Sequence, residues 1–169
     1  TLLALGRKEE ALVAWRQALR APFDPAFTDL AIAARVAALE ALGRPRERLE
    51  TFDLALQRQP RKVSYWVDKA LSHDELGQLE QAVSALDRAV ELEERNASAR
   101  YHRAALHAEL GHRQAALLDL ELAVGVAPGV RALAKQDPRF ASLNLDASFQ
   151  ALLPQSAKGA TGASDEEIF

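Results

Sequence analysis

The chain has 169 residues, including 34 Ala and 27 Leu but only 9 Val and 2 Ile, and it has no Cys or Met. This surplus of strong helix formers argues against a sheet protein, and the missing Cys exclude a disulfide framework, a thiolate metal site and a cysteine nucleophile. The net charge of −3 gives no basic nucleic-acid footprint, and no apolar run approaches the roughly 20 residues that a membrane-spanning helix needs.

The first element in chain order is half of a repeat unit. Position 1 is Thr, so we interpret the chain as a processed product or a piece of a longer one. Residues 1–24 begin with Leu5-Gly6 and then follow the pattern of a second helix, whereas the first helix is almost entirely missing. The connection from Ala21 to Thr28 carries two Pro and two Phe. We interpret it as a stiff linker whose rings fill the seam between repeats, with aromatics displayed for a partner as the alternative.

A Leu-Gly pair then recurs along the chain, with its glycines at Gly6, Gly43, Gly77 and Gly111. Twelve residues after each Gly stands Ala, and nine residues after it stands a large apolar residue. A nearly fixed period of about 34 residues is typical of a solenoid. Each Gly suits a chain reversal with positive φ between two helices, and the small Ala lets neighbouring helices approach closely.

These motifs resemble the tetratricopeptide repeat, a helix-turn-helix unit of about 34 residues. The unit around Gly77 runs from Ser64-Tyr65-Trp66 to Ala89. The unit around Gly43 is looser, since Arg48 stands where the family usually has Ala. The resemblance implies an all-α, right-handed superhelical array of antiparallel helix pairs. We expect the array over 1–128, with a half repeat at about 1–24 and full repeats at about 29–62, 63–96 and 97–130.

A different pattern follows the array, and we expect a helical C-terminal cap over 129–153. Asp137 and Asp146 each begin a segment with Phe three residues later and Leu six residues later. Asp is a good N-cap, and Phe and Leu three apart share one face of a short helix. The cap is similar to the ending of bacterial tetratricopeptide arrays. Two such turns predict a plug for the end of the solenoid, which would otherwise expose its core.

The tail over 154–169 is rich in Gly, Ala and Ser and ends in an acidic-hydrophobic segment. Its composition is typical of a flexible linker. We hypothesise that Ile168 and Phe169 dock onto an apolar patch of this chain or of a second copy, with an incidental contact as the alternative.

No pattern indicates an enzyme, a cofactor or a metal site. The chain has no Gly-rich phosphate loop after a strand, no His-Glu-x-x-His and no Gly-x-Ser-x-Gly. His73 and His107 hold equivalent places in two repeats, which favours a packing role. His102 and His107 are five residues apart, so they do not share a helix face, and His112 lies in a turn.

A basic ladder stands eight residues before three of the glycines, at Arg35, Lys69 and Arg103. One interpretation is a stripe that binds an acidic partner. The other is an ion pair between the two helices of one unit, and we favour it for Arg103 with Asp119. Lys69 and Arg35 lack an equivalent Asp.

The concave face of the array is the predicted binding surface, because in this family the first helix of each unit lines it. Its floor is small and apolar and its rim is acidic. It suits an extended or helical segment with apolar anchors and basic flanks, although some of the Ala must pack helices. The predicted lining residues are Ala33, Ala37, Glu40, Val67, Asp68, Leu71, Glu75, Tyr101, His102, Ala105 and Glu109.

The sequence therefore predicts a non-catalytic scaffold that binds an unknown protein or peptide, without nucleic acid and without membrane insertion. One alternative is a self-assembly module that oligomerises through its open N-terminal end or by tail exchange. The other is a regulatory region of a larger protein. We expect a soluble chain, with the cytoplasm favoured over the periplasm.

Overall fold

A computed structural model describes the backbone from Pro25 to Leu153 and the side chains from Asp29 onward. It also describes three isolated residues before this stretch, Arg7, Glu10 and Val13. The predicted half repeat over 1–24, apart from three isolated residues, and the tail with Ile168 and Phe169 lie outside these described residues. Between Pro25 and Leu153 the chain forms helices and no strand. The helices are α2 (Pro25–Ala41), α3 (Pro45–Arg58), α4 (Val63–Glu75), α5 (Leu79–Leu92), α6 (Ala97–Glu109), α7 (Arg113–Val126), α8 (Val130–Gln136), the 3₁₀ helix η1 (Pro138–Leu143) and α9 (Ala147–Leu152).

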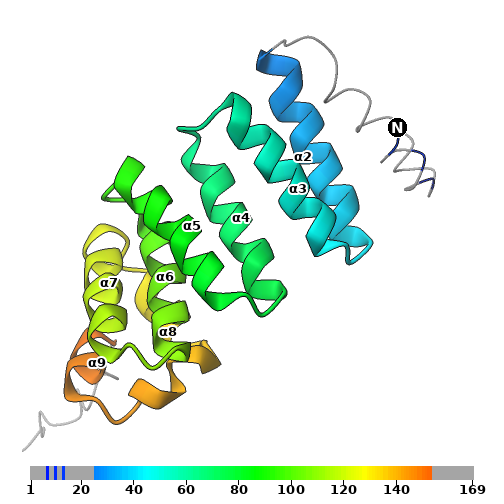
Figure 1. The fold of residues 1–169 in the computed structure, drawn as a ribbon. Helices are drawn as coiled ribbons and strands as arrows, with labels where there is room; N and C mark the ends of the chain where they lie inside the picture. Colours follow the sequence, from blue (N-terminus) through cyan, green and yellow to red (C-terminus); the bar gives the residue numbers. More distant parts are fainter. Residues whose placement is uncertain (1–6, 8–9, 11–12, 14–24, 154–169) are drawn as a thin grey trace, which may run out of the picture.

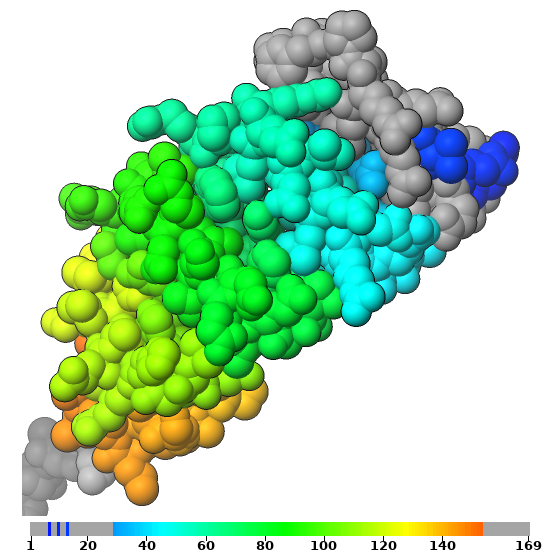
Figure 2. Space-filling model, in the orientation of Figure 1, coloured from blue at the N-terminus to red at the C-terminus, as the bar shows by residue number. Residues whose placement is uncertain are grey.

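The helices from α2 to α7 form antiparallel pairs that stack side by side along one direction (Figure 1). Each helix packs on the next one in sequence, and the cap closes the far end against α6 and α7. The space-filling view shows the described repeats as one continuous elongated body (Figure 2). The fold is therefore the all-α array of helix pairs that the sequence predicts.

Three glycines reverse the chain inside the pairs, with φ of 63° at Gly43, 70° at Gly77 and 78° at Gly111. These values lie in the left-handed region, which favours glycine because a Cβ is strained there. In each turn the residue after Gly donates its N–H to the carbonyl five residues earlier, as from Gln78 to His73 at 2.9 Å. This bond satisfies a carbonyl that the ending helix leaves open.

Helix α2 begins at Pro25, before the start expected for this repeat at about residue 29. The end of the predicted linker is thus helical. Pro suits the first position of a helix because its fixed φ is helical and its missing N–H has no intrahelical partner there.

The core runs along the stack as successive apolar clusters at the helix seams. Ala82, Leu86 and Ala89 of α5 have no exposed area, which fits the predicted role of small residues where helices meet. At the C-terminal end the core is completed by the cap. Phe140 and Phe149 are fully buried, with ring centroids 5.6 Å apart.

The two predicted N-caps of the C-terminal segment are present. Asp137 accepts a hydrogen bond from the N–H of Arg139, and Asp146 accepts bonds from the N–H groups of Ser148 and Phe149. Each carboxylate satisfies N–H groups that the start of a helix leaves open. Leu143 is buried beside Phe140, as their spacing predicts.

A carboxylate at the first seam ties α2 to the next repeat and makes stability depend on pH. Asp29 accepts hydrogen bonds from Tyr65 Oη at 2.6 Å, Gln59 Nε2 at 2.7 Å and Lys62 Nζ at 3.0 Å. These bonds lower the pKa of Asp29 from 3.8 to about 2. The native state therefore holds this proton less tightly than the unfolded chain, so the stabilisation is present above pH 3.8 and is lost as the pH falls toward 2.

We expect Asp29→Asn to remove this part of the acid sensitivity. The stability difference between wild type and variant should be greatest above pH 5 and shrink toward pH 2, as melting curves across this range will measure. The side chain of Asp29 is 42% exposed, so the loss at neutral pH should stay near about 1 kcal/mol because solvent screens the contacts. A difference that does not change with pH would show that the charge of Asp29 contributes nothing.

Candidate binding groove

A hollow of about 150 Å³ opens between α2, α3 and α4, on the side where the first helices of two repeats face each other. Four of the predicted groove residues line it: Glu40, Asp68, Leu71 and Glu75. The sequence did not single out the other lining residues as part of this surface. They are Val36, Arg48 and Phe52.

Arg48 lies at the floor of this hollow and is 6% exposed. Its Nε donates to Ser72 Oγ at 2.9 Å, and its Nη2 lies 2.5 Å from Glu75 Oε2. The equivalent positions in the next two repeats hold Ala82 and Ala116, as the family pattern expects. The sequence showed that Arg48 replaces the usual Ala, but it did not predict that the Arg48 side chain would contact α4. The guanidinium fills space in the hollow and adds a positive charge, whereas Ala at this position would do neither.

Two carboxylates at the hollow, Glu40 and Asp68, have no hydrogen-bond or ion-pair partner among the described residues. Glu40 is exposed, and Asp68 is half-buried. Burial raises the pKa of Asp68 and the charge of Glu40 raises it further, against the opposing effect of Arg48. The hollow therefore keeps negative charge that the described protein groups do not fully neutralise.

The other predicted groove residues of the first two repeats differ in how far they are exposed to solvent. Ala33 and Ala37 are exposed on α2, so this stretch of the face is open. Val67 is only 8% exposed and belongs to the apolar cluster at the seam of α4, α5 and α6. Val67 therefore mainly packs against its neighbours in this cluster.

The cap covers the equivalent face of the last repeat. Ala105 has no exposed area and lies in one apolar cluster with Phe140 of η1. Tyr101 packs against Phe140 with ring centroids 6.0 Å apart and donates to Asp137 Oδ2 at 2.8 Å. Burial and this hydrogen bond raise the pKa of Tyr101 to about 12. The cap thus occupies the surface that the sequence assigns to a partner in this repeat.

Two further residues of that repeat lie at the edge of the cap. Glu109 is exposed and lines a shallow hollow with Pro138 and Arg139. His102 is half-buried, and burial lowers its pKa. Arg139 reaches past α6 to Asp74 of α4, with Nη1 3.1 Å from Oδ2. This ion pair joins the cap to the preceding repeat.

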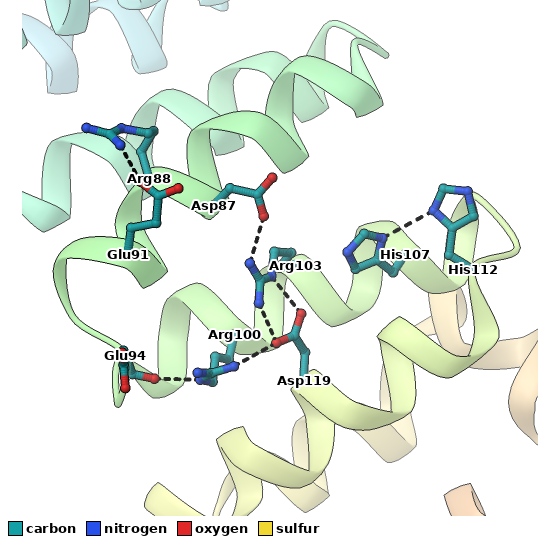
Figure 3. A network of polar contacts seen from close by, with 9 residues as sticks. All are labelled: Asp87, Arg88, Glu91, Glu94, Arg100, Arg103, His107, His112 and Asp119. Carbon is teal, nitrogen blue, oxygen red and sulfur yellow. Dashed lines mark hydrogen bonds and ion pairs between the residues drawn. The ribbon is translucent and has the colours of Figure 1, made fainter.

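Two members of the basic ladder, Lys69 and Arg103, form ion pairs with carboxylates of neighbouring helices. Arg103 donates from Nε and Nη2 to Asp119, each at 2.7 Å, which confirms the predicted pair within one unit (Figure 3). Its Nη1 also donates to Asp87 of the preceding repeat at 2.7 Å. Lys69 repeats this second contact with Asp53 at 2.6 Å. The sequence missed it because the acid belongs to the previous unit. Arg35 is buried, at 3% exposed.

Three of the four histidines lie at two turns of the same form. His73 Nδ1 lies 2.7 Å from Gln78 Oε1, and His107 Nδ1 lies 3.3 Å from His112 Nδ1. Burial lowers the pKa of His107. Within the part of the chain that the structure describes, no group of three or more His, Cys, Asp or Glu could hold a metal ion.

Antiparallel helix pairs that stack at a regular interval define the chain as a helical-repeat solenoid. Residues 75–111 match the family model described as TPR repeat. These residues therefore match a tetratricopeptide repeat, and the described helices share the fold of solved tetratricopeptide-repeat structures.

Solved structures share this fold over most of their length. MamA is 18% identical with a TM-score of 0.70, over 89% of this chain and 87% of that one. TTC0263, a thermophilic TPR protein of Thermus thermophilus, is 28% identical with a TM-score of 0.62, over 89% and 82%. YrrB, described as a TPR protein with an unusual peptide-binding site, is 21% identical with a TM-score of 0.66, over 89% and 77%. No curated protein sequence matches the chain.

None of the helices in the described residues is both long and apolar enough to span a membrane.

Proposed function

We propose that the chain is a non-catalytic binding module that holds a segment of another protein in the groove between α2 and α4. The observation that carries this proposal is the hollow in which Glu40 and Asp68 have no partner among the described residues. A half-buried carboxylate without a partner gains when a cation or hydrogen-bond donor arrives. The peptide-binding site that the description of YrrB names supports the use of this fold for such a segment.

The hollow suits a basic side chain of the bound segment. The aliphatic stem of a Lys or Arg can pack on apolar side chains while its charged end reaches a carboxylate. The hollow offers both, since Glu40 and Asp68 lie near apolar walls. Those walls are formed by Val36, Phe52 and Leu71.

The position of the cap limits how long the bound segment can be. Arg48 already pairs with Glu75, so its positive charge is matched within the protein. The face of α6 is covered by η1. The open surface is therefore the stretch across α2 and α4, with Ala33 and Ala37 leaving room beside it. A short extended segment or about two helical turns fits this span.

A phage-displayed library of short random peptides tests the proposal. We expect the selected peptides to combine a Lys or Arg with apolar anchors. Their affinity should fall about tenfold or more for Glu40→Lys, because this change places a like charge at the hollow. The matched control is Glu121→Lys, which makes the same charge change at an exposed position of α7. Peptides that bind the Glu40→Lys variant as well as wild type would refute the placement.

Self-association is the alternative to this module. The open N-terminal end and the tail lie outside the described residues, so the structure adds no contact for either. Molar mass against concentration separates the two functions. The proposed module predicts a constant monomer mass, whereas a mass that rises with concentration and returns to the monomer without residues 154–169 would favour tail exchange.

A further inference from the structure

Two imidazole rings face each other across the turn between α6 and α7. His107 stands in the last turn of α6 and His112 directly precedes α7. Their Nδ1 atoms are 3.3 Å apart and their ring centroids 5.5 Å apart (Figure 3). The backbone turn holds the two residues close together, because the N–H of His112 donates to the carbonyl of His107 at 2.8 Å across Gly111. The turn thus brings together rings that the five-residue spacing would separate on a helix.

The preceding repeat provides an internal comparison. His73 and Gln78 hold the equivalent places one repeat earlier, in a turn with the equivalent backbone bond of 2.9 Å. There a ring nitrogen meets an amide oxygen at 2.7 Å, so a donor faces an acceptor. At the second turn Nδ1 of His107 meets Nδ1 of His112 instead, and either nitrogen donates or accepts according to its tautomer. Neutral imidazole carries only one N–H, and its other nitrogen is a metal ligand.

The spacing of the two nitrogens matches chelation of one cation. Zn²⁺ binds histidine nitrogen at about 2.0–2.1 Å, and tetrahedral geometry then places two such nitrogens about 3.3–3.4 Å apart. The Nδ1 atoms of His107 and His112 are already at this separation. Only the orientation of the rings has to adjust for both lone pairs to point at one ion, and His112 is exposed.

The charges around the pair permit a cation. Asp87 and Asp119 both act electrostatically on His107, and Arg103 opposes them. The geometry points to a binding site for one borderline transition-metal cation, with Zn²⁺ as the reference ion, held by Nδ1 of His107 and Nδ1 of His112. Among the described residues no third His, Cys, Asp or Glu completes the set, so the proposed site leaves its other positions to water. This site lies apart from the groove of α2 and α4.

Calorimetric titration of the metal-free full chain with zinc chloride at pH 7 tests this site. We expect one ion per chain for wild type. His112→Gln copies the side chains of the preceding turn and preserves its hydrogen bond, so folding should be kept while the affinity for zinc falls about tenfold or more. Circular dichroism checks that the helices of this variant are unchanged.

The reverse substitution gives an independent test. Gln78→His places a second histidine pair on the preceding turn, and the number of bound zinc ions should rise from one to two. Long-range ¹H–¹⁵N spectra of the histidine rings should show zinc at Nδ1 of His107 and His112 in wild type. Zinc binding that is the same in wild type and His112→Gln, no binding by wild type, or no additional ion in Gln78→His would overturn the inference.

Discussion

Replacement of Asp119 by Ala is expected to lower the free energy of unfolding by about 3 kcal/mol, because two partly buried guanidinium groups then lose a buried counter-charge. The side chain of Asp119 is 4% exposed. It accepts from Arg100 Nη1 at 2.9 Å and from two nitrogens of Arg103 at 2.7 Å. These hydrogen bonds raise the pKa of Arg103 above its ordinary value. A guanidinium is protonated at neutral pH even without such bonds, so the arginine stays charged after the substitution. Urea unfolding followed by circular dichroism measures the loss.

Asp87 supplies the matched control for this prediction. It pairs with the same Arg103 (Figure 3), but its side chain is 49% exposed. Solvent replaces an exposed partner at little cost, so Asp87→Ala should lower stability by less than about 1 kcal/mol. If both substitutions cost the same, burial of the ion pair is not what makes Asp119 important.

The contrast between these two acids shows how far a repeat pattern predicts contacts. The pair of Arg103 with Asp119 lies within one unit, where the period fixes which helices face each other. The pairs of Arg103 with Asp87 and of Lys69 with Asp53 join consecutive units. Their geometry depends on the angle at which one unit stacks on the next, and a single unit's spacing does not contain that angle. The sequence therefore predicted only the pair within one unit.

The groove shows the same limit on a larger scale. The residues that share one face of α2, α4 and α6 follow from helical periodicity, and the structure places Glu40, Asp68, Leu71 and Glu75 around one hollow. The sequence also predicted that the C-terminal segments would close the array. It did not predict that η1 would lie on α6 and cover Ala105, because the direction of a short connection after a broken period is set by tertiary packing.

Phe140→Ala should remove most of the attachment of the cap to the last repeat, with a loss of about 3–5 kcal/mol. Phe140 is fully buried, and its ring lies 5.6 Å from that of Phe149 and 6.0 Å from that of Tyr101. Alanine leaves a cavity between η1 and α6 that their backbones can close only in part. Urea unfolding measures the total loss of unfolding free energy, and amide hydrogen exchange shows which helices are destabilised.

The position of this loss distinguishes a cap that supports only its neighbours from one that controls the whole array. Each repeat of a solenoid contacts mainly the adjacent ones, so exchange should become faster in α6 and α7 and stay nearly unchanged in α2 and α3. Leu145→Ala is the control, because Leu145 is 100% exposed and should change stability by less than about 0.5 kcal/mol. A stability of Phe140→Ala within about 1 kcal/mol of wild type would contradict the packing role of the cap, since a buried ring rarely costs so little.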